Sequence, residues 1–154
     1  MSDSIASRLA AAGVELPTPA APAANYVPTV RSGSMLYVSG QVPMGPDGLE
    51  FQGRCGAEYD IAKGQAAARL CAINILAQAK AALGDLEAIG RLVKLTCFVN
   101  STPDFGDQPA VANGASDFLV EILGDRGRHT RSAVGVANLP FGVAVEIEAI
   151  IEIA

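Results

Sequence analysis

Over residues 143–153, at the end of the chain, every second residue is apolar, and three of the residues between them are glutamates. A period of two residues is typical of a strand, because successive side chains point to opposite faces of a sheet. We expect residues 131–136 to be its antiparallel neighbour, after a turn through residues 140–142. One face, which must meet the helices, holds Val143, Val145, Ile147, Ala149, Ile151 and Ile153; the other holds Ala144, Glu146, Glu148, Ile150 and Glu152.

Two stretches instead show the three- or four-residue spacing of a helix with one apolar face. The first, over residues 57–83, places Gln65 on its apolar face, where the amide needs a hydrogen-bond partner. The second runs from about residue 109 to residue 123, with Asp107 as its expected N-cap. Their apolar positions are Ile61, Ala68, Cys71, Ile75, Ala79 and Leu83 in the first helix and Val111, Ala115, Phe118 and Ile122 in the second.

Shorter apolar runs complete the set of elements. Residues 26–38 predict two strands, and residues 92–99 predict another, rich in β-branched side chains. The order of long elements is then β-β-α-β-α-β-β. It predicts an α+β domain whose two helices cover one face of a single sheet.

The N-terminal segment, residues 1–25, differs from the rest. A short helix is expected over residues 5–12. Residues 17–28 are rich in proline and alanine and predict an extended arm, because proline and the residue before it disfavour helix. We therefore divide the chain into this segment and one domain over residues 26–154.

Charged residues are scarce along the chain, and acidic residues outnumber basic ones. Charged residues make up 18%, and 11 Lys and Arg stand against 16 Asp and Glu, for a net charge of −5. Low charge favours an oligomer, because interface cores are depleted of charged residues. The acidic balance argues against binding to nucleic acid, which needs a basic face. We see no apolar run near the length of a membrane span and expect no membrane partner.

Cysteine and histidine usage excludes several kinds of site. Cys55, Cys71 and Cys97 are widely spaced, and His129 is the single histidine. Neither a disulfide framework nor a metal site is expected, and the motifs that bind phosphate-bearing cofactors do not occur. Cys71 and Cys97 fit core positions, whereas the role of Cys55 is open. The N-terminus lacks the basic and apolar regions of a secretory signal, so we expect a cytoplasmic protein.

Four positions could carry chemistry. A guanidinium at the start of a strand, as at Arg131, can bind a carboxylate bidentately or simply be solvated. Glu146 lies either on a wet outer face or in an interface, where burial would raise the pKa of its carboxyl toward the range of a general acid or base. Tyr26 fits packing or ligand contact, and Gly40 lets the backbone approach a ligand.

Four sequence blocks, taken in this order, resemble the RidA/YjgF family, the reactive-intermediate imine deaminases. The resemblance covers residues 26–153. The blocks are YV at 26–27, LYVSGQVP at 36–43, RSAVGVANLP at 131–140 and VEIEAI at 145–150. The resemblance implies a chorismate-mutase-like fold with a mixed sheet, assembled as a homotrimer with the sheets inward and three clefts between subunits.

The resemblance also implies a reaction and roles for particular residues. The family hydrolyses enamines and imines such as 2-aminoacrylate and 2-iminopropionate to 2-keto acids and ammonia, without a cofactor. Arg131 matches the arginine that binds the substrate carboxylate, and Glu146 matches the glutamate that positions and activates water. The substrate-binding positions are Tyr26, Gly40, Asn113 and the backbone at Ala133.

Some positions depart from the family pattern. Ala133 stands where a cysteine is usual, and Ser116 stands where the second helix has a tyrosine. These departures leave a second possibility open, a trimer that binds a small carboxylic acid or a protein partner without turnover. Ribonuclease activity, a label that the family has carried, is disfavoured by the acidic balance.

Overall fold

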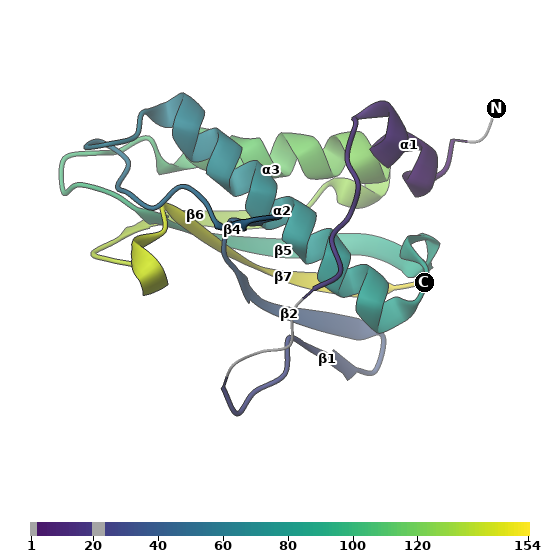
Figure 1. The fold of residues 1–154 in the computed structure, drawn as a ribbon. Helices are drawn as coiled ribbons and strands as arrows, with labels where there is room; N and C mark the ends of the chain where they lie inside the picture. Colours follow the sequence, from purple (N-terminus) through teal and green to yellow (C-terminus); the bar gives the residue numbers. More distant parts are fainter. Residues whose placement is uncertain (1–2, 20–23) are drawn as a thin grey trace.

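Two long helices, α2 (Ile61–Leu83) and α3 (Gln108–Leu123), lie on one face of a five-stranded sheet (Figure 1). The computed structural model describes residues 3–19 and 24–154. This arrangement confirms the expected α+β class with helices on one face of a mixed sheet. The sheet contains β1 (Thr29–Ser32), β2 (Met35–Gln41), β5 (Ile89–Asn100), β6 (Thr130–Val136) and β7 (Val145–Ile153), while β3 (Met44–Gly45) and β4 (Gly48–Leu49) form a separate hairpin.

The strand order is β1-β2-β7-β5-β6, and β6 is an edge strand that runs parallel to β5. The expected antiparallel pairing of residues 131–136 with the last strand is therefore wrong, because β7 pairs with β2 and β5 instead. Parallel neighbours need a long crossover connection, and α3 supplies it between β5 and β6. This crossover places the start of β6 beside α3.

The alternation expected for the last strand is confirmed in β7. The side chains of Val145, Ile147 and Ile151 are buried under the helices, while Glu148 is exposed on the opposite face. Ala144 was expected on that opposite face, but it precedes the strand and is buried. Its backbone N–H donates to the Phe51 carbonyl at 2.8 Å, so the loop around Phe51 covers it.

α2 begins later than its sequence pattern indicates, whereas α3 begins within one residue of the expected position. α2 begins at Ile61 rather than near residue 57, because the Asp60 side chain caps it by accepting from the Lys63 N–H at 2.9 Å. Asp107 occupies the N-cap position of α3, as expected, but its side chain makes no capping hydrogen bond to the described residues. The first strand begins at Thr29, so Tyr26 lies before it in a bend.

The two helices approach each other closely at Gly114 on α3. A Cβ atom there would overlap the backbone carbonyl of Gln65 on α2. The Gln65 side chain also crosses this contact, since its Nε2 donates to the Ala110 carbonyl at 2.8 Å. That bond provides the partner that the sequence analysis required for a glutamine on an apolar helix face.

Gly114→Ala is expected to destabilise the fold by about 1–3 kcal/mol, the usual cost of forcing extra atoms into a packed contact. The obstacle is backbone, which cannot rotate away as a side chain could. The measurement is urea unfolding followed by circular dichroism. Gly106→Ala is the matched control, because a Cβ at Gly106 meets no described atom within 4 Å. Equal unfolding midpoints for the two variants would contradict the prediction.

The length and composition of α2 alone would suit a membrane span, contrary to the expectation from the sequence. Its 23 residues contain a window of mean hydropathy 1.2, but 56% of that window is buried inside the fold. The helix packs on α3, β2 and β7. Its apolar character therefore has a structural role within this fold.

The first helix, α1 (Ile5–Ala11), joins the same hydrophobic core as the rest of the chain. Ile5 and Leu9 are buried, and the Ile5 N–H donates to the Glu87 carboxylate at 2.8 Å. Glu87 belongs to a short 3-10 helix, η1 (Leu86–Ala88), just before β5. Of the proline- and alanine-rich arm, residues 20–23 lie outside the described residues.

All three cysteines are free and buried. Desolvation raises the pKa of each thiol, to about 12 for Cys97. Cys55, whose role the sequence left open, is a core residue: it is 0% exposed, and its backbone N–H donates to the Asn100 carbonyl at 2.9 Å. The thiols therefore pack the core and are poor nucleophiles.

Candidate functional site

Arg131 projects from the start of β6 toward α3. Its Nη1 donates to Asn113 Oδ1 at 2.9 Å and to Ser116 Oγ at 3.1 Å, and its Nη2 donates to the Pro109 carbonyl at 3.4 Å. Asn113 and Ser116 are three residues apart and therefore lie on the same face of the helix. The structure thus brings Arg131 together with Asn113, two residues to which the resemblance assigns roles in binding substrate.

These contacts leave one edge of the guanidinium free. Nη1 carries two hydrogens, and both are directed to α3 side chains. The Nε hydrogen and the second Nη2 hydrogen have no acceptor among the described residues. Two parallel N–H groups at this spacing match the two oxygens of a carboxylate. The free edge is thus suited to a carboxylate ligand.

Ser116 and His129 belong to this cluster, although the sequence analysis assigned neither a role. His129 Nε2 lies 2.9 Å from Ser116 Oγ, and His129 Nδ1 lies 2.6 Å from the Gly127 carbonyl. A hollow of about 260 Å³ is lined by Ser116, Val120, Arg128, His129 and Arg131. Two sequence signals could have found the pair: Ser116 follows Asn113 at helix spacing, and His129 precedes Arg131 at strand spacing.

Ala133 lies two residues beyond Arg131 on β6 and packs against the hydrophobic core. β6 pairs with β5 on one side only, so part of its backbone has no strand partner among the described residues. Backbone N–H and C=O groups on such an edge can bind a ligand. The position therefore suits the main-chain contact expected of Ala133.

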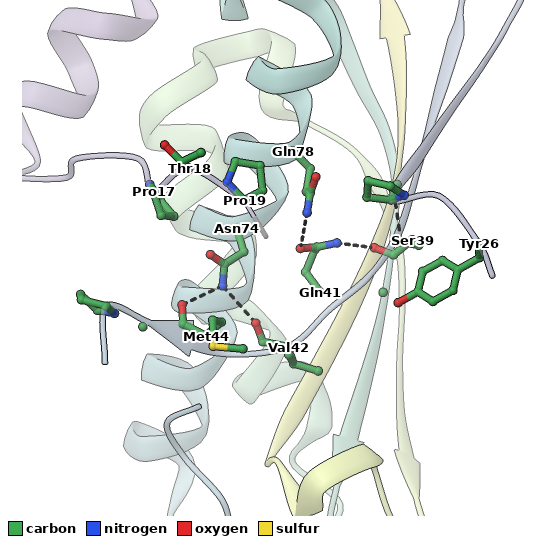
Figure 2. Close-up of a pocket in the computed structure, with 14 residues that line it drawn as sticks. Pro17, Thr18, Pro19, Tyr26, Ser39, Gln41, Val42, Met44, Asn74 and Gln78 are labelled. Atoms are coloured by element: carbon green, nitrogen blue, oxygen red, sulfur yellow. Dashed lines mark hydrogen bonds between the residues drawn. The ribbon is translucent and has the colours of Figure 1, made fainter. Parts of the chain in front are cut away.

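Tyr26 and Gly40 line a second hollow, of about 380 Å³, at the end of β2 (Figure 2). Figure 2 shows Tyr26 beside Ser39, with Asn74 and Gln78 of α2 further along the hollow. Asn74 Nδ2 donates to the carbonyl of Val42, which follows β2, and to that of Met44, the first residue of β3, so this amide fixes the link between the two strands. The described residues that line this hollow are all uncharged.

Glu146 lies against Gly40 on the face of β7 that the helices leave uncovered. A Cβ atom at Gly40 would overlap Oε2 of Glu146, so the glycine is required for this close approach. Burial raises the pKa of the Glu146 carboxyl above its ordinary value, and repulsion from Glu148 adds to the effect. A carboxyl of this kind exchanges a proton more readily near neutral pH than an exposed one.

Within one chain, Arg131 and Glu146 project from opposite faces of the sheet. Arg131 pairs in register with Leu95, which is buried beneath the helices. Glu146 pairs with Phe98, and Phe98 pairs in turn with the exposed Val134 on the uncovered face. The chain therefore contains two separate groupings, Arg131 with Asn113 and Glu146 with Gly40.

Glu146→Gln is expected to raise the melting temperature at pH 7 more than at pH 4. The pKa of this carboxyl is raised by burial in the folded chain. A group whose folded-state pKa exceeds its unfolded value stabilises the fold at low pH, and that contribution is lost as pH rises through the folded-state pKa. Glutamine does not titrate, so the variant escapes this loss. Thermal unfolding at both pH values tests the prediction, with exposed Glu152→Gln as control; a pH-independent difference would contradict it.

The family comparison matches residues 6–149 to a family described as "YjgF/chorismate mutase-like, putative endoribonuclease". Protein TCP17 of Trypanosoma cruzi is 51% identical over 97% of this chain and 94% of its own length. A 2-iminobutanoate/2-iminopropanoate deaminase of Salmonella typhimurium is 34% identical over 84% of this chain and 90% of its own.

Two solved structures extend the likeness to the fold. The protein Atu1372 of Agrobacterium tumefaciens, described as of unknown function, aligns with a TM-score of 0.92 and 52% identity over 99% of this chain and 95% of its own. Escherichia coli TdcF with bound serine aligns with a TM-score of 0.64 and 32% identity over 88% of this chain and 93% of its own.

Proposed function

The chain belongs to the RidA/YjgF family, and from this premise we propose that it hydrolyses small 2-imino acids, and the enamines in equilibrium with them, to 2-oxo acids and ammonia. The observation that carries the proposal is the guanidinium of Arg131, held by Asn113 and Ser116 with one donor edge free. Relatives described as imine and reactive intermediate deaminases support the choice of reaction.

The reaction requires little from the protein. The imine carbon is already electrophilic, so water adds to it and the resulting aminoalcohol loses ammonia. Arg131 binds the substrate carboxylate and fixes the position of the imine carbon. Glu146 accepts a proton from the attacking water and returns a proton to the departing nitrogen. The raised pKa of the Glu146 carboxyl suits both transfers.

Because Arg131 and Glu146 lie on opposite faces of one sheet, the proposal requires two neighbouring copies of the chain. The edge of β6 from one copy would meet the Gly40 and Glu146 region of the next, in a homotrimer. The uncovered sheet face supports this assembly, since Tyr37 is 46% exposed and Val134 is 42% exposed there. Large apolar side chains exposed together on one face favour burial against another subunit.

The test is the hydrolysis of 2-iminobutanoate. An amino-acid oxidase generates the imine in situ, and semicarbazide traps whatever remains. We expect the trapped product to fall in proportion to the concentration of this protein. The same amount of heat-unfolded protein is the control. A native sample that removes no more imine than the unfolded sample would overturn the proposal.

A carboxylate-binding protein without turnover is the second candidate. Ala133 and Ser116, which stand where the family pattern has a cysteine and a tyrosine, favour it. Its signature would be an increase in melting temperature with 2-oxobutanoate, without any imine hydrolysis. The net charge of −5 disfavours the ribonuclease alternative.

A further inference from the structure

The hydrogen bonds around Arg131 form a chain with one direction. The Gly127 carbonyl can only accept, so His129 Nδ1, at 2.6 Å from it, carries a hydrogen. In a neutral ring Nε2 is then an acceptor, and the Ser116 hydroxyl at 2.9 Å donates to it. The lone pairs of Ser116 Oγ are left for Arg131 Nη1 at 3.1 Å. Each member fixes the orientation of the next.

This series of hydrogen bonds determines which edge of the guanidinium is available to a ligand. An arginine side chain has many rotamers, and ordering it at the moment of binding opposes association. Here Ser116 and Asn113 bind both hydrogens of Nη1, so the edge formed by Nε and Nη2 remains for a ligand. Without His129 as acceptor, the Ser116 hydroxyl could rotate and donate elsewhere, and its lone pairs would no longer be held toward Nη1.

We propose that Ser116 and His129 are positioning residues that hold Arg131 ready to bind the carboxylate of a 2-imino or 2-oxo acid. The inference rests on the proposed function only for the identity of that ligand. Neither residue touches the reacting carbon. Their contribution is to the affinity for the carboxylate, which appears in Kd and KM, while kcat changes little.

Two neutral variants of His129 separate this role from a merely structural one. Glutamine can place an oxygen near the position of Nε2, so His129→Gln keeps an acceptor for Ser116 and loses the bond to Gly127. Asparagine can place a nitrogen near the position of Nδ1, so His129→Asn keeps the hydrogen bond to the Gly127 carbonyl but loses the acceptor for the Ser116 hydroxyl. Positioning predicts that the asparagine variant is the weaker binder. A structural role through the Gly127 contact predicts the reverse order.

The experiment measures the Kd of 2-oxobutanoate by calorimetry, together with KM and kcat for 2-iminobutanoate. We expect Ser116→Ala and His129→Asn to raise Kd and KM about 10-fold, as for the loss of a hydrogen bond to a charged group. His129→Gln should bind within about 3-fold of the wild type, since its acceptor is retained. Glu121→Ala, at an exposed position of α3, is the control, and melting temperatures show that each variant is folded.

The double variant adds a second criterion. Ser116 and His129 act through one chain of bonds, so Ser116→Ala with His129→Asn should bind about as weakly as Ser116→Ala alone. Additive losses would mean that the two residues act separately and would overturn the inference. Should a variant fail to fold, His129→Gln against the wild type still tests the claim that the Gly127 bond alone is dispensable.

The inference and the proposed function fail in different ways. If the wild-type protein binds 2-oxobutanoate but hydrolyses no imine, the proposed function is wrong. The Kd values of the variants then still test the positioning roles. Unchanged Kd and KM in Ser116→Ala and His129→Asn, in a protein that does hydrolyse the imine, overturn the positioning claim alone. A wild-type protein that binds no 2-oxobutanoate overturns the positioning claim as well.

Discussion

Arg131→Ala is expected to reduce kcat/KM for 2-iminobutanoate by about 30- to 5,000-fold, corresponding to about 2–5 kcal/mol for a desolvated charge pair that loses one partner. The guanidinium is held by α3 with its Nε and Nη2 edge free, so its removal leaves the substrate carboxylate without its expected partner. The effect should be largest in KM, because the carboxylate is bound in the ground state as well as in the transition state.

The control is Arg31→Ala, which removes a guanidinium from an exposed position on β1. It should leave kcat/KM within about 2-fold of the wild type, as expected for a surface charge away from the site. Arg131→Lys adds a further comparison, since lysine keeps the charge but cannot present two parallel N–H groups. A fully active Arg131→Ala protein would show that the carboxylate is bound elsewhere.

Glu146→Gln is expected to reduce kcat by about 100- to 10,000-fold, the usual contribution of a positioned acid or base. Glutamine keeps the shape of the side chain beside Gly40 but cannot accept a proton from water. KM should change little, because the proposed binding of the carboxylate by Arg131 is not altered. The contrast with Arg131→Ala, which acts mainly on KM, distinguishes the two roles in one set of rate measurements.

Glu148→Gln is the matched control, because Glu148 lies on the same face of β7 and is exposed. The negative charge of Glu148 contributes to the raised pKa of Glu146, so its removal should move the acid limb of the pH–rate profile to lower pH. The maximal kcat should remain. Equal losses of kcat in the two variants would indicate that the proton acceptor is not specifically Glu146.

The strand period and the helix spacing were sufficient to predict the long helices and strands, but not the short β3–β4 hairpin. β7 could be predicted because its inward positions are apolar without exception, and a one-residue error would have exposed all of them. The pairing of β6 could not be predicted in the same way. Its sequence is compatible with either neighbour, and the choice is made by α3, which returns the chain beside β5.

The site divides similarly into predictable and unpredictable parts. Arg131 and Glu146 were assigned roles because the surrounding motifs resemble a family, whereas their placement on opposite faces follows from strand register. Ser116 and His129 were missed because each was considered alone. A serine within a helix and a histidine in a basic loop are ordinary by themselves. Their relation becomes visible only in the fold, where the crossover brings Ser116 Oγ to 2.9 Å from His129 Nε2.

The three buried thiols have a practical consequence for work with this protein. The thiolate is the nucleophile that attacks alkylating and spin-label reagents, and burial suppresses its formation at Cys55, Cys71 and Cys97. A single cysteine introduced at an exposed position would therefore accept a fluorophore or nitroxide almost without background from the native residues. Distances between labels on different subunits of the proposed homotrimer could then be measured on the otherwise unaltered chain.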